Sequence, residues 1–138
     1  MILLLLAVIG WIVFSTLGYR TDRDYGFNRI KIDESQIAGA LEMYSNVYGA
    51  FPPGNAESIE RILSGEDLNG KNLKKIQFFI FKRSIEHSNE MTDPWGTPYA
   101  INFLSTNSFV ISSAGKNKIF GDADDIVFNS VSHDFVKP

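Results

Sequence analysis

Residues 1–18, MILLLLAVIGWIVFSTLG, form an apolar run at the start of the sequence. No charged residue occurs between Ile2 and Leu17, and eleven of these sixteen residues are Leu, Ile, Val or Phe. A helix over this run rises about 27 Å, close to the roughly 30 Å of a bilayer's hydrocarbon core. We therefore expect residues 1–18 to form a transmembrane helix that is retained as an anchor.

A cleaved signal peptide and a buried core helix are the alternatives for this run. A signal peptide has a basic start and a small-residue cleavage site. Here Met1 leads directly into leucines, and residues 15–19 (STLGY) match such a site poorly. The residues that follow the run are of mixed charge (RTDRD, 20–24), so the charge pattern alone leaves the membrane orientation open.

A polar hinge is expected at residues 19–29, YRTDRDYGFNR. Gly18 directly precedes this stretch, and Gly26 lies near its end. Glycine costs about 1 kcal/mol in a helix interior. An amphipathic helix is predicted at 30–49, because apolar residues recur there at helical spacing: Ile30, Ile37, Leu41, Tyr44 and Tyr48. Gly49 and the FPPG sequence at 51–54 predict that this helix stops at Tyr48 or Gly49.

The remaining residues predict a short helix and a small sheet. The helix covers 56–64, and the apolar run 76–81 (IQFFIF) is a buried strand or a buried helical turn. Alternating apolar residues at 99–103 and 109–111 indicate a hairpin, and 126–131 is a further strand. The fold class is therefore α+β: a long N-terminal helix packed on a small antiparallel sheet within 76–131, in one head domain at 30–138.

Composition excludes several classes of protein. The chain has no cysteine, so no disulfide stabilises the head. Its net charge of −3 argues against a nucleic-acid partner, which would require a basic surface. The two histidines, His87 and His133, lie in polar sequence with no neighbouring nucleophile, so no enzymatic activity is expected.

A structural turn is predicted at Asp93-Pro94-Trp95-Gly96. Pro94 at the second position and Gly96 at the fourth fit a type I turn, and the Asp93 carboxylate is placed to accept hydrogen bonds from nearby N–H groups. Trp95 would then anchor the turn on the sheet or on the long helix.

The acidic loop, residues 113–126 (SAGKNKIFGDADDI), is the candidate cation site. It contains Asp122, Asp124 and Asp125 within four residues, with Asn117 upstream. Carboxylate, amide and carbonyl oxygens are the ligands that calcium takes, whereas the His and Cys ligands that zinc or copper prefer are absent from the loop. The spacing differs from that of an EF-hand, and a solvated acidic turn is the alternative.

Together these features resemble the major pseudopilins of type II secretion systems, within the type IV pilin-like superfamily. The resemblance is carried by the N-terminal helix, the break at Phe51-Pro52-Pro53, the DPWGTPY sequence at 93–99 and the acidic loop. It implies an inner-membrane, single-pass subunit with a periplasmic head that associates with other pseudopilin subunits through its N-terminal helix.

The resemblance also implies a calcium ion in the acidic loop. Its ligands would be Asn117, Asp124 and Asp125, with Asp122 as a further candidate and backbone carbonyls around Ser112 and Ile119. The sequence departs from the family at Leu5, where the family carries an acidic residue. A pilin-like binding module or minor pilin that is anchored but does not polymerise is therefore the alternative function.

Overall fold

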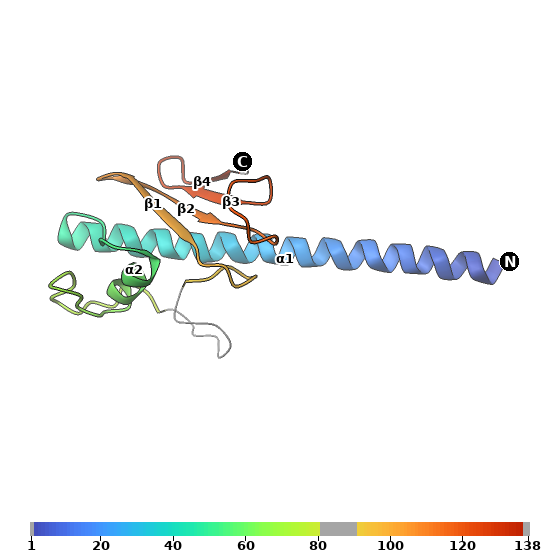
Figure 1. Ribbon diagram of the computed structural model, residues 1–138, viewed down its shortest axis with the longest axis horizontal. Helices are drawn as coiled ribbons and strands as arrows, with labels where there is room; N and C mark the ends of the chain where they lie inside the picture. Colours follow the sequence, from blue (N-terminus) through green and yellow to red (C-terminus); the bar gives the residue numbers. More distant parts are fainter. Residues whose placement is uncertain (1, 81–90, 137–138) are drawn as a thin grey trace.

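The computed structural model describes residues 2–80 and 91–136, and in the first helix it describes side chains from Tyr25 onward. Helix α1 spans Ile2–Tyr48 and α2 spans Ala56–Leu63. Four strands, β1 (Ala100–Ser105), β2 (Ser108–Ser113), β3 (Ile126–Asn129) and β4 (Asp134–Val136), form one antiparallel sheet in the order β1-β2-β3-β4. The sheet lies along the C-terminal half of α1, and the N-terminal half projects beyond it (Figure 1). The predicted α+β fold is confirmed.

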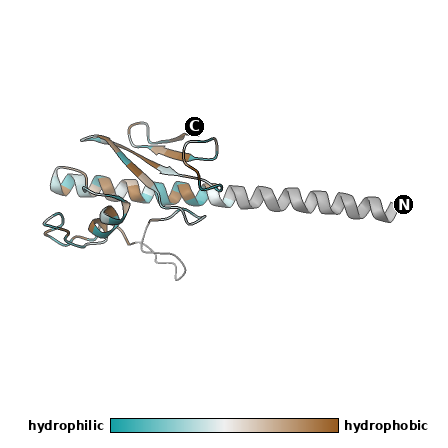
Figure 2. Ribbon diagram, viewed as in Figure 1, coloured by the Kyte–Doolittle hydropathy of each residue, from teal (hydrophilic) through white to brown (hydrophobic). Residues whose placement is uncertain are grey.

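The core lies between α1, the sheet and α2. Apolar residues recur along the C-terminal half of α1 and alternate along β2 and β3 (Figure 2). The buried apolar side chains of α1, among the residues described in full, are Ile30, Ile37, Ala38, Ala40, Leu41 and Tyr44. They are covered by Phe109 and Ile111 of β2, by Ile126 and Phe128 of β3, and by Ile59, Ile62 and Leu63 of α2. The core therefore depends on one face of a single helix.

The end of α1 at Tyr48 was correctly predicted. Gly49 adopts a φ of +78°, which L-residues rarely adopt, and its N–H donates to the Ser45 carbonyl at 2.7 Å. Helix α2 then begins after Asn55, whose side chain accepts a hydrogen bond from the Ser58 N–H at 3.0 Å. Its observed end, Leu63, is one residue before the predicted one.

The predicted hinge at 19–29 is wrong, because α1 passes through these residues without interruption. Gly26 is buried under the ring of Trp95: a Cβ added to Gly26 would lie 2.6 Å from Trp95 Cζ2 and 2.9 Å from Cη2. The small local cost of glycine in a helix is therefore outweighed by a packing contact that only glycine permits. The separate amphipathic helix predicted at 30–49 is the C-terminal part of α1.

The sheet begins and ends later in the chain than predicted. Residues 76–80 adopt no regular structure; the N–H groups of Phe78 and Phe79 instead donate to the Leu63 carbonyl at 2.8 and 3.2 Å. At the other end, Asp134–Val136 is strand β4, paired with β3 and beyond the predicted last strand at 126–131. Phe81, the last residue of the apolar run 76–81, and the candidate histidine His87 lie outside the described residues.

A buried asparagine fixes the connection between α2 and residues 76–80. The Asn72 amide donates to the carbonyls of Ile62 and Ile76 at 2.9 and 2.8 Å. Its oxygen accepts from the Ile76 N–H at 3.0 Å and from the Tyr48 hydroxyl at 2.8 Å. Since Asn72 is fully buried, these bonds satisfy groups that would otherwise be costly to desolvate.

Gly26→Ala tests the packing explanation for this glycine. We expect the substitution to lower the free energy of unfolding by about 1 to 3 kcal/mol, because the added methyl group overpacks against Trp95. Urea denaturation of the full chain in detergent measures the change. Gly39→Ala is the matched control in the same helix, because its Cβ would meet no atom within 4 Å and alanine favours helix by up to about 1 kcal/mol. Equal stability of the two variants would contradict the explanation.

Candidate functional site

The predicted turn at Asp93-Pro94-Trp95-Gly96 is confirmed. The Gly96 N–H donates to the Asp93 carbonyl at 2.9 Å and closes the turn. Asp93 Oδ1 accepts from the N–H groups of Trp95 and Thr97 at 3.0 and 2.9 Å. Asp93 is 4% exposed, so its carboxylate accepts these hydrogen bonds in the protein interior.

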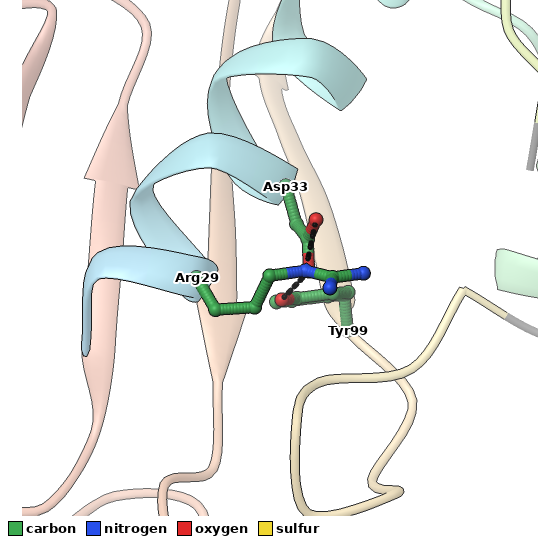
Figure 3. A network of polar contacts seen from close by, with 3 residues as sticks. All are labelled: Arg29, Asp33 and Tyr99. Atoms are coloured by element: carbon green, nitrogen blue, oxygen red, sulfur yellow. Dashed lines mark hydrogen bonds and ion pairs between the residues drawn. The ribbon is translucent and has the colours of Figure 1, made fainter. Parts of the chain in front are cut away.

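Tyr99 attaches this turn to α1. Its hydroxyl donates to Asp33 Oδ2 at 3.3 Å, and Arg29, one helical turn before Asp33, donates through Nε to the same carboxylate at 2.9 and 3.0 Å (Figure 3). Burial and then the negative charges of Asp33, Glu34 and Asp93 raise the pKa of Tyr99 far above its ordinary range. Tyr99 is therefore a hydrogen-bond donor throughout the physiological pH range.

The same turn is also attached to the acidic loop. The hydroxyl of Ser113, the last residue of β2, donates to Asp93 Oδ2 at 2.7 Å. The Ser113 oxygen in turn accepts from the Gly115 N–H at 3.1 Å. Both Asp93 and Ser113 are buried, so the two motifs, which are separate in sequence, form one hydrogen-bonded unit.

Three of the predicted metal ligands are neighbours within the acidic loop. Asp124 Oδ2 accepts from the Asn117 backbone N–H at 3.0 Å, and Asp122 Oδ2 accepts from the Asn117 side-chain amide at 2.7 Å. Asp122 Oδ1 accepts from the Asp124 N–H at 2.8 Å. The structure therefore brings Asn117, Asp122 and Asp124 together through N–H groups directed at carboxylate oxygens.

Asp125, the fourth predicted ligand, has a different environment. It is 5% exposed, and its Oδ2 accepts from the Gly121 N–H at 2.6 Å. Its Oδ1 is buried and has no hydrogen-bond partner among the described residues. A buried carboxylate oxygen without a donor is costly, and a cation would remove that cost. This oxygen is the observation by which the loop fits a hard cation.

The three aspartates do not form a cluster of converging carboxylates. Among the described residues, no group of three or more His, Cys, Asp or Glu side chains is arranged to hold a metal ion. Any cation here would need neutral oxygens as well, and the loop supplies the Asn117 amide oxygen and backbone carbonyls. Calcium accepts such mixed oxygen ligands.

Glu34 is a buried acid that sequence reasoning missed. It is fully buried on α1, and neither Oε1 nor Oε2 has a hydrogen-bond partner among the described residues. Desolvation, followed by the charges of Asp33 and Asp93, raises the pKa of Glu34 to about 9. Glu34 is therefore protonated at neutral pH in the folded protein.

The spacing of α1 contained the signal for this burial. Ile30, Glu34, Ile37 and Leu41 follow one another at intervals of four, three and four residues, so Glu34 occupies a position of the apolar stripe. Because Glu34 is charged, hydropathy alone would assign it to the polar face of the helix.

The remaining sequence candidates do not join these residues. His133 is exposed, with Nε2 at 3.9 Å from Glu42 Oε1, and its ring lies edge-on to Phe128. Among the residues described in full, 25–80 and 91–136, no helix is long and apolar enough to cross a membrane. The predicted membrane span at 1–18 lies outside that part of the chain.

The long helix, the antiparallel sheet and the two linked loops define a pilin-like fold. Among solved structures, the chain is similar to the major pseudopilin from the type 2 secretion system of enterohaemorrhagic Escherichia coli, with a TM-score of 0.54. The two share 19% sequence identity, over 80% of this chain and 90% of that chain. No protein-family model and no curated protein matches the sequence. The likeness confirms the pseudopilin resemblance at the level of the fold.

Glu34→Gln tests the buried acid. A carboxyl group whose pKa is raised from 4.5 to about 9 on folding binds an extra proton in the folded state between these pH values. The contribution of Glu34 to the free energy of unfolding is therefore largest below about pH 4.5. It falls by about 1.4 kcal/mol per pH unit between about pH 4.5 and about pH 9. We expect Glu34→Gln to remove this slope and to be more stable than the wild type at pH 8.

Urea denaturation at pH 5, 6.5 and 8 measures the slope. Glu57→Gln is the control, because Glu57 is an exposed acid of α2. If the wild type and Glu34→Gln lose stability equally between pH 5 and 8, Glu34 is not the titrating group.

Proposed function

We propose that this protein is a membrane-anchored structural subunit of a type II secretion, pilus-like fibre, with a calcium-stabilised head. The observation that carries the proposal is the architecture: one uninterrupted helix, Ile2–Tyr48, whose C-terminal half is covered by the head and whose N-terminal half projects beyond it (Figure 1). A projecting helix is available to pack against neighbouring subunits.

The amino-acid sequence of the projecting half supports a membrane anchor. Residues 2–17 carry no charge and are predominantly Leu, Ile and Val, which are favourable in a bilayer by a few tenths of a kcal/mol each. This run would lie in the inner membrane, and the head would lie in the periplasm. In that compartment a head without cysteine relies on its core and on the acidic loop for stability.

Calcium is the cation that the acidic loop would take. Asp124, Asp125 and Asn117 would bind it, with Asp122 as a further ligand and carbonyls around Ser112 and Ile119 completing the set. The buried Asp125 Oδ1, which has no partner among the described residues, supports this assignment. Bound calcium would neutralise the loop's carboxylates and hold β2 and β3 together at this end of the sheet.

An anchored pilin-like subunit that stays monomeric is the second candidate. Leu5 favours it, because related subunits are expected to carry an acid there that would set the register between neighbouring helices. In the proposed fibre, that register would have to come from contacts of the head and of the remaining apolar run. Both candidates are structural or binding roles without catalysis.

Assembly distinguishes the two candidates. Full-length protein, after detergent removal in the presence of calcium, is expected to form filaments of uniform width in negative-stain electron microscopy. A variant in which residues 2–17 are scrambled keeps the composition and hydrophobicity, and it should give irregular aggregates, because helix packing requires a specific sequence. Wild-type protein that remains monomeric in vesicles would favour the second candidate.

Calcium removal tests the acidic loop. A site filled at about a hundred times its dissociation constant adds about 2.7 kcal/mol, so chelation should lower the Tm of the full chain by about ten degrees or more. The double variant Asp124→Ala with Asp125→Ala should lose the response to calcium. Asp134→Ala, which removes an exposed acid of β4, should keep it. A wild-type Tm that is the same with calcium and with chelator would refute the calcium assignment.

A further inference from the structure

A chain of hydrogen bonds crosses from the turn at 93–99 into the acidic loop. It begins at Asp93 Oδ2, which accepts from the Ser113 hydroxyl at 2.7 Å. It continues through the Ser113 oxygen, which accepts from the Gly115 N–H at 3.1 Å. The backbone at the start of the loop is thus held by a carboxylate from a different part of the chain.

Gly115 is the point where the two ends of the acidic loop touch. Its φ is +66°, and a Cβ added there would lie 2.4 Å from the Asp124 carbonyl oxygen and 2.7 Å from Asp124 Oδ2. Because Gly115 carries no side chain, its backbone can pack closely against Asp124, and two residues further on the Asn117 N–H donates to Asp124 Oδ2 at 3.0 Å. The backbone that Ser113 holds at Gly115 thus leads directly into a hydrogen bond to Asp124.

Asp93 is poorly placed to be a ligand itself. Oδ1 already accepts two hydrogen bonds from the turn, and Oδ2 accepts the one from Ser113. Both oxygens are thus engaged by protein donors in a buried site. Groups that orient metal ligands in this way strongly affect affinity without contacting the ion.

We propose that Asp93 and Ser113 are positioning residues that set the affinity of the acidic loop for calcium without ligating it. This inference rests on the proposed calcium site and adds the group that controls it. The coupling is reciprocal, because a hydrogen-bond chain that favours calcium is itself favoured by calcium. Bound calcium would then also stabilise the turn that holds Trp95 over Gly26, and so the attachment of the sheet to α1.

Ser113→Ala isolates this link, because it removes one hydroxyl group and leaves the Asp93 turn and every predicted side-chain ligand in place. Ser130→Ala is the matched control: Ser130 is also buried in the sheet region, and its oxygen accepts from the Phe109 N–H at 2.8 Å. Both variants lose a buried serine that accepts from a backbone N–H, so they should lose comparable stability without calcium.

Isothermal titration of calcium chloride into the full chain in detergent measures the dissociation constant. We expect Ser113→Ala to raise the Kd about tenfold, in line with the loss of a group that orients metal ligands, and Ser130→Ala to leave it unchanged. A second variant, Asp93→Asn, should also raise the Kd while it keeps an acceptor for the turn N–H groups. Asp93→Asn takes the place of Ser113→Ala in this test if Ser113→Ala does not fold.

The outcomes separate this inference from the calcium assignment. If the wild type binds calcium and Ser113→Ala binds it as tightly as Ser130→Ala does, the positioning role is refuted and the calcium site stands. If the wild type binds no calcium at millimolar concentration, the calcium site is refuted and the positioning role with it. An equal loss of affinity in both serine variants would indicate a general effect of stability and would also refute the positioning role.

Discussion

The structure depends on covering the apolar face of α1. A single helix cannot bury its own stripe, so Ile30, Ile37 and Leu41 require partners from elsewhere in the chain. The sheet supplies one side through Phe109 and Phe128, and α2 supplies another. Because the partners lie at one end of a long helix, the head forms there and the rest of α1 extends away from it. Other features of the head follow from how the loops attach to this arrangement.

The loops are attached by hydrogen bonds to buried polar side chains. Asn72 holds the connection after α2, and Asp93 holds the turn before β1 and, through Ser113, the start of the acidic loop. Each of these side chains is buried and engages backbone or hydroxyl donors, so removing one would leave unpaired groups in a low-dielectric interior. In a head without disulfides, such side chains replace covalent cross-links as local constraints.

Glu34 and Asp125 are buried carboxylates with oxygens that lack a hydrogen-bond partner among the described residues, and they differ in what would satisfy them. Glu34 lies in the core beside other acids, so it is satisfied by taking up a proton. Asp125 lies in a loop rich in oxygen ligands, with one oxygen already bound to a backbone N–H, so a cation suits it better. A proton at Glu34 and a cation at Asp125 would each remove the cost of a buried, unpaired carboxylate. Because only Asp125 has other oxygen ligands around it, only the acidic loop is proposed as a calcium site.

The sequence by itself determined the features that depend on neighbouring residues. The end of α1 at Gly49 follows from a residue that tolerates positive φ, and the turn at 93–96 follows from the spacing of Asp, Pro and Gly. The alternation of Phe109 and Ile111 likewise predicted β2 and the face it buries. The composition of the acidic loop indicated a possible cation site, but not which carboxylate would be buried.

Only the tertiary structure decided the features that depend on residues distant in sequence. From its local sequence, Gly26 is an unfavourable residue in a helix. The Trp95 ring packs on Gly26 only because residue 95 folds back onto α1. Residues 76–80 have the composition of a strand, but the N–H groups within them donate to the Leu63 carbonyl instead of to a neighbouring strand. Strand β4 forms near the end of the chain because it can pair with the edge of β3. The burial of Glu34 and the link from Asp93 to Ser113 have the same origin. Local propensities of residues other than proline differ by at most about 1 kcal/mol per residue, so a single long-range contact can override them.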